Sequence, residues 1–124
     1  MEWIHFIALL AIIQYLYFGF QVGRARDRYG IKAPAISGNE EFERFYRVQS
    51  NTLEVLVAFL PALYIAADEW STTLVGLIGL VYLVGRFIYA RSYVANPASR
   101  ATGFLLSVGP IFVLLLMGLL GVIF

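Results

Sequence analysis

Apolar residues dominate this chain in four long runs that short polar segments separate. The runs extend roughly from Trp3 to Gln21, from Arg47 to Ala67, from Thr72 to Tyr93 and from Ala98 to Phe124. Each run is close to the ~20 residues that a helix needs to cross the hydrocarbon core of a bilayer. The pattern therefore predicts an all-α integral membrane protein, a four-transmembrane-helix bundle with short connections.

The polar segments between the runs contain residues that end and begin helices. The longest lies between Arg24 and Arg44 and has the glycine, proline and asparagine residues typical of a loop. Residues 68–71 predict a tight turn between the second and third runs. In the Asn96-Pro97 pair, asparagine can cap a helix and proline suits its first position. This cap would place Arg100 in the first turn of the fourth helix.

Composition supports the assignment to the membrane and indicates a single domain. The 124 residues are 60% hydrophobic and only 14% charged, and the mean hydropathy is +0.78. There are no internal repeats, so we expect one domain, residues 1–124. No small-residue cleavage site precedes the arginines after the first run, which we expect to be a retained helix.

The chain offers few groups for other kinds of chemistry. The net charge of +1 argues against a nucleic-acid partner. There is no cysteine, and His5 is the only histidine. These absences disfavour a disulfide, a cysteine or serine–histidine nucleophile and a histidine-bound metal. We therefore expect no metal cofactor.

Basic residues are distributed on one side of the predicted bundle. All of them lie in, or within about two helical turns of, the first and third connections. They are Arg24, Arg26, Arg28, Lys32, Arg44, Arg47, Arg86, Arg91 and Arg100. By the positive-inside rule, these two connections face the cytoplasm and both termini face away.

A polar stripe enters the second run from this same side. Glu43, Arg44, Arg47, Asn51 and Glu54 fall within roughly a third of the helix circumference. An ionisable group at membrane depth costs about 2.5–3.5 kcal/mol and usually faces protein or water. The stripe ends partway along the run, so it predicts a pocket that opens at one membrane surface and not a channel.

A second polar face lies at the end of the third run, where Tyr82, Arg86, Tyr89 and Tyr93 share one side of a helix. Tyrosines at a membrane boundary usually form an aromatic belt, which is the expectation for Tyr82. Tyr89 and Tyr93 share their face with an arginine and are expected to point inward. Together with Arg100, these faces offer guanidiniums for carboxylates and a carboxylate for an amine, which suits a small zwitterionic ligand with several carboxylates.

These motifs resemble the membrane-associated proteins of eicosanoid and glutathione metabolism. The resemblance is carried by FERFYRVQSNTLE at 42–54, QVGRAR at 21–26, PAISG at 34–38, GLVY at 79–82 and RATGF at 100–104. It covers nearly the whole chain, and within the family it is strongest to the branch of microsomal glutathione transferase 2 and leukotriene C4 synthase. In one departure, Val55 occupies a position where the family often has an aromatic residue.

The resemblance implies a homotrimer in which glutathione, the co-substrate, binds between neighbouring subunits near the cytosolic face. By this analogy Arg100 is the catalytic residue beside the thiol. The implied glutathione contacts are Arg26, Arg47, Gln49, Asn51, Glu54, Tyr89 and Tyr93. Gln49 points about 160° away from Glu54 on a helix, so the two could hardly serve one pocket within a single subunit.

Three functions remain open at this point. The first is a glutathione transferase of detoxification, with glutathione-dependent peroxidase activity as a related reaction, acting on hydrophobic electrophiles at the bilayer. The second is a non-catalytic lipid-binding scaffold of the same family, which would be expected to lack glutathione contacts. The third is a small multidrug transporter, which should place an ionisable residue near mid-membrane.

Overall fold

The computed structural model describes residues 1–124 and contains four long helices. They are α1 (Glu2–Tyr29), α2 (Glu40–Glu69), α3 (Thr72–Ala95) and α4 (Ala101–Ile123), with a one-turn 3₁₀ helix η1 (Pro97–Ser99) before α4. All four are long and apolar enough to cross a membrane. The prediction of an all-α, four-span fold is confirmed.

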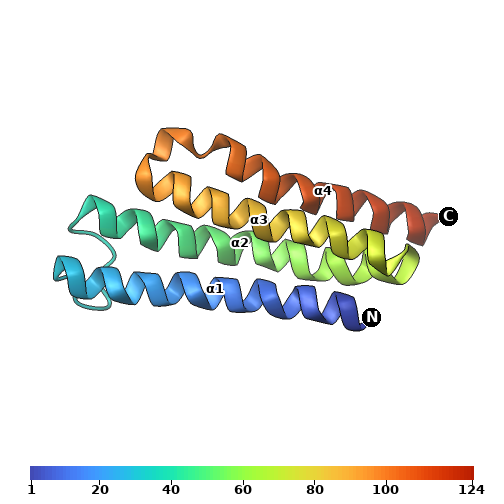
Figure 1. Ribbon diagram of the computed structural model, residues 1–124, viewed down its shortest axis with the longest axis horizontal. Coiled ribbons are helices and arrows are strands. Elements are labelled where there is room, and N and C mark those ends of the chain that lie inside the picture. Colours follow the sequence, from blue (N-terminus) through green and yellow to red (C-terminus); the bar gives the residue numbers. More distant parts are fainter.

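The helices lie side by side along the long axis of the molecule, with α2 and α3 between α1 and α4 (Figure 1). The α1–α2 and α3–α4 connections lie at one end, and both termini lie at the other with the α2–α3 turn. The alternation expected of four consecutive spans is therefore present. It places the segments rich in arginine at a single end.

Two helices extend further into the first connection than the apolar runs indicated. α1 continues to Tyr29, and α2 begins at Glu40. Gly30 ends α1 in the left-handed conformation, with φ 68°, which glycine adopts without a steric penalty. Asn39 caps α2, its side chain accepting a hydrogen bond from the backbone N–H of Phe42 at 3.0 Å. The first loop is therefore limited to residues 30–39.

The start of the fourth helix differs from the prediction of one continuous helix from Ala98. Asn96 does act as a cap, but of η1, where its side chain accepts from the N–H of Ala98 at 3.1 Å. α4 then begins separately at Ala101, with Arg100 at its N-cap position. Arg100 is consequently at the boundary of α4 and not within its first turn.

Helix α3 is the most enclosed of the four: half of its apolar segment is buried, compared with 28% for α4. Its backbone approaches α4 closely through glycines. A Cβ atom on Gly85 would lie 2.5 Å from the carbonyl carbon of Leu106, and one on Gly103 would lie 2.3 Å from the backbone nitrogen of Tyr89. Small residues allow such approach in lipid, and here they set the position of α4 relative to the tyrosines.

Tyr82 is not part of an aromatic belt. Its side chain is fully buried, and its ring stacks on Phe59 with centroids 3.8 Å apart and planes 9° apart. The expectation was wrong because helix periodicity alone does not distinguish a boundary tyrosine that faces lipid from one that faces a neighbouring helix.

Candidate functional site

A cleft of about 400 Å³ opens between α2, α3 and α4 near the end that carries the two arginine-rich connections. This volume is within the range of small-molecule sites. The lining residues are Tyr46, Arg47, Ser50, Asn51, Glu54, Tyr89, Tyr93, Arg100 and Phe104. The structure thus brings together six of the eight site residues that the sequence suggested.

Helix α2 contributes the charged wall of the cleft. Arg47 and Glu54 each lie three and four residues from the adjacent pair Ser50 and Asn51, so the four side chains share one face. Arg47 and Glu54 are exposed, and Asn51 between them is half-buried. A cation, an amide and an anion are therefore arranged in sequence along the helix, which is complementary to a ligand that carries separated charges of both signs.

Helix α3 contributes two phenol rings. Tyr89 and Tyr93 are largely buried, and their rings stack with centroids 5.6 Å apart and planes 17° apart. The prediction that both tyrosines face inward is confirmed. A stacked pair has few alternative rotamers, so the hydroxyl groups are held in place without a ligand.

Arg86 lies behind the cleft and connects its walls. It is fully buried in the bundle. Its guanidinium donates to Thr52 Oγ1 at 2.8 Å, to Asn51 Oδ1 at 3.2 Å and to Ser107 Oγ at 3.2 Å. Its Cζ atom also lies 4.4 Å from the ring centroid of Tyr89. One cation therefore contacts all three helices that line the cleft.

The bond from Arg86 determines which way the Asn51 amide points. Because the amide oxygen accepts from the guanidinium, the amide NH₂ group is directed elsewhere and can donate to a ligand. The sequence indicated that Arg86 faces inward, but it did not identify this supporting role. The only signal was its position three residues before Tyr89, on the same helix face.

Arg100 approaches the cleft from the beginning of α4. It is exposed, and no side chain caps this helix end. The first N–H groups of a helix lack internal partners and give the N-terminus a partial positive charge. A guanidinium and a helix N-terminus thus add their positive potentials at one edge of the cleft.

Two of the suggested residues lie outside the cleft of this subunit. Arg26 donates to the carbonyl oxygen of Ala35 at 2.7 Å, and its guanidinium lies 4.9 Å from the ring centroid of Phe42. Gln49 extends towards α1, where a Cβ on Gly19 would be 2.8 Å from its Nε2 atom. Both side chains belong to the α1–α2 side of the bundle. A single subunit does not bring them to the other six.

The four helices contain no group of three or more His, Cys, Asp or Glu side chains that could hold a metal ion. The polar groups of the cleft instead suit an organic ligand with carboxylates and an amine.

Comparisons with known proteins agree on one family. Residues 4–120 match the family model described as the MAPEG family. The chain is 45% identical over 104 residues to the uncharacterised protein sll1147 of Synechocystis sp., covering 84% of this chain and 76% of that protein. It is 38% identical over 116 residues to human microsomal glutathione S-transferase 2, covering 94% of this chain and 79% of the relative. It is 33% identical over 117 residues to guinea-pig (Cavia porcellus) leukotriene C4 synthase, covering 94% and 78%.

Proposed function

The chain belongs to the MAPEG family and is an integral membrane protein, and from this premise we propose that it is a membrane-bound glutathione transferase. Its relatives include a glutathione S-transferase and a leukotriene synthase by name, which supports a glutathione-related transferase or synthase role. The observation that supports the specific proposal of a glutathione transferase is the set of side chains that line the cleft. It joins Arg47, Asn51, Glu54 and the two tyrosines to Arg100.

Glutathione has two carboxylates, an amine, two amides and a thiol, and the cleft offers a group for each kind. Arg47 can bind a carboxylate through two parallel hydrogen bonds. Glu54 accepts from the amine, and the Asn51 NH₂ group donates to a carboxylate or amide oxygen. The hydroxyls of Tyr89 and Tyr93 supply further hydrogen bonds. Arg100 then interacts with the thiol.

The complete site requires a second subunit in this proposal. Arg26 and Gln49 lie on the α1–α2 side of the bundle, away from their own cleft. In a closed ring each subunit presents one face to one neighbour and a different face to the other. A homotrimer would therefore allow these two side chains to complete the cleft of the adjacent subunit.

The chemistry proposed for the cleft is activation of the substrate's own thiol. The chain has no cysteine, and a cysteine thiol with an ordinary pKa of about 8.5 is only slightly ionised at neutral pH. Arg100 and the start of α4 favour the thiolate, and the thiol proton passes to solvent. The thiolate sulfur then bonds to an electrophilic carbon, and the leaving group departs with its electron pair.

A related peroxidase reaction follows from the same thiolate. Its sulfur attacks the terminal oxygen of a lipid hydroperoxide and the O–O bond breaks. The departing alkoxide takes a proton from solvent to become the alcohol, and a second glutathione converts the resulting sulfenic acid to glutathione disulfide and water. The lipophilic second substrate would reach the thiol laterally from the bilayer. The cleft lies at the arginine-rich end, so the proposed active site faces the cytoplasm.

The direct test uses purified protein in mild detergent, with glutathione and a chlorinated nitroaromatic electrophile. We expect chloride release and a thioether product. Arg100→Ala should lower kcat by about one to two orders of magnitude, the effect of about 2.7 kcal/mol or less on the barrier. It should also raise the pKa of the bound thiol, measured by thiolate absorbance against pH, while glutathione affinity changes less.

Lys32→Ala is the matched control, because it removes one positive charge from the same end without touching the cleft. Unchanged turnover and thiolate absorbance in a folded Arg100→Ala protein would show that this arginine does not activate the thiol. Glutathione binding by the unmodified protein with no conjugation or peroxidase activity would favour the non-catalytic scaffold instead.

A further inference from the structure

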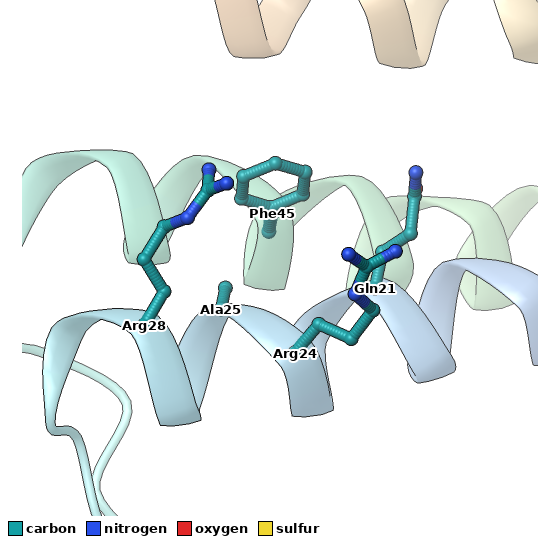
Figure 2. A pocket seen from close by; sticks show the side chains of 5 residues that line it. All are labelled: Gln21, Arg24, Ala25, Arg28 and Phe45. Carbon is teal, nitrogen blue, oxygen red and sulfur yellow. The ribbon is translucent and has the colours of Figure 1, made fainter.

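A groove separate from the cleft runs between α1, α2 and α3 at the same end of the bundle. Its outer part is a cavity of about 320 Å³ lined by Gln21, Arg24, Ala25, Arg28 and Phe45 (Figure 2). Its inner part is a cavity of about 430 Å³ that shares Gln21 and Phe45 with the outer one. The two cavities are therefore adjacent parts of one groove.

The outer part of the groove is cationic. Figure 2 shows the Arg28 guanidinium beside the Phe45 ring, with Arg24 and Gln21 on the other side of the cavity. Arg91 of α3 lines the inner cavity, and no Asp or Glu lines either part. By contrast, Arg44 nearby donates to the carbonyl oxygen of Val94 at 3.2 Å. The groove thus has three arginines and no protein carboxylate to balance them.

The inner part of the groove is mostly apolar and aromatic. Its walls include Tyr17 and Phe18 of α1 and Phe87 and Ala90 of α3. Tyr17 and Phe87 are about half exposed, at 43% and 51%. Exposed apolar side chains on a membrane-spanning helix are suited to contact with lipid chains. A cationic part joined to a mostly apolar part matches an amphiphile with an anionic headgroup.

On α1 and α3, the arginines of the groove lie on different helix faces from the residues proposed to bind glutathione. At 100° per residue, Arg24 and Arg28 are about 40° apart on α1, and each is about 160° from Arg26. On α3, Arg91 is about 160° from both Tyr89 and Tyr93. A neighbouring subunit that receives Arg26 would therefore contact the face of α1 opposite to Arg24 and Arg28.

We propose that this groove binds an anionic phospholipid of the surrounding bilayer. The phosphate contacts Arg24 and Arg28, and one acyl chain follows the aromatic walls past Phe87. A bilayer lipid is favoured over a soluble anion because its acyl chain can cover the apolar part of the groove, whereas a soluble anion would occupy only the cationic part. Basic pockets between transmembrane helices near the cytoplasmic surface bind such headgroups by the same physics.

The test is lipid binding by native mass spectrometry of the intact protein, titrated separately with dioleoyl phosphatidylglycerol, dioleoyl phosphatidylcholine and oleate. We expect the phosphatidylglycerol to bind most tightly. Arg24→Gln and Arg28→Gln should each weaken it about fivefold, the ratio that corresponds to about 1 kcal/mol per arginine near the surface. Arg28→Lys keeps the charge and should retain most of the affinity.

Lys32→Gln is the control, because it removes the same charge from the same end but does not line the groove. Equal binding of phosphatidylglycerol and phosphatidylcholine, or equal weakening by Lys32→Gln and Arg24→Gln, would overturn the proposal. Preferential binding of oleate would also overturn it, by showing a site for free fatty carboxylates. Glutathione affinity, measured in parallel, should not change in Arg24→Gln.

Discussion

Replacing Arg86 with methionine separates the support of the cleft from the stability of the bundle. The change keeps a long apolar stem but removes the guanidinium that bonds to Asn51, Thr52 and Ser107. We expect the protein to remain folded and to bind glutathione more weakly.

The effect on folding is small because two large contributions oppose each other. Hydrogen bonds to a charged group stabilise by about 1.5–3 kcal/mol each. Removing a buried cation, however, also recovers a desolvation cost of several kcal/mol. Ser107 keeps its bonds to the carbonyl oxygens of Gly103 and Phe104, at 2.9 and 3.0 Å. The melting temperature in detergent should therefore shift by only a few degrees.

The effect on the ligand is larger. An anion that accepts from the Asn51 NH₂ group would lie about 8 Å from the guanidinium, the sum of two hydrogen bonds and the amide between them. At an effective dielectric constant of 20, a charge at that distance contributes about 2 kcal/mol. Losing it, together with the fixed amide orientation, should raise the Kd for glutathione by about 10- to 30-fold.

The measurement is isothermal titration calorimetry of purified protein in detergent, with circular dichroism to follow unfolding. Arg86→Lys should recover part of the affinity, because it restores the charge but not the planar set of donors. Lys32→Met controls for the loss of a positive charge outside the cleft. A glutathione Kd within twofold of the unmodified protein in folded Arg86→Met would refute the reasoning.

Three further predictions follow from the arrangement of the helices. Single cysteines at Ser37 and Asp68 should react with a membrane-impermeant thiol reagent from opposite faces of sealed vesicles, and labelling from one face would contradict four spans. The protein should be a trimer in mild detergent, and full glutathione affinity in a monomeric preparation would refute the role of Gln49 across an interface. Gly103→Ala should destabilise the bundle by about 1–3 kcal/mol, because its Cβ would meet the α3 backbone at 2.3 Å. Gly109→Ala, with nothing within 4 Å, is the matched control, and equal melting temperatures would show that α4 can shift freely.

Much of the cleft could be predicted from the sequence because it is built from residues close together on single helices. The spacing of Arg47, Asn51 and Glu54 determines that they share a face whatever the helix packs against. The same holds for Tyr89 and Tyr93. The four spans were predictable for a similar reason, since the bilayer sets the length of an apolar run.

Other features depend on contacts between residues far apart in the chain, which a repeat along one helix does not specify. The buried position of Tyr82 results from Phe59 of α2, and the role of Arg86 results from oxygen atoms on α2 and α4. The break before Ala101 was missed because Pro97 and Asn96 suit the start of a 3₁₀ turn as well as that of an α-helix. Helix periodicity thus determined which side chains face the same way, and only the packing of the four helices determined what each face meets.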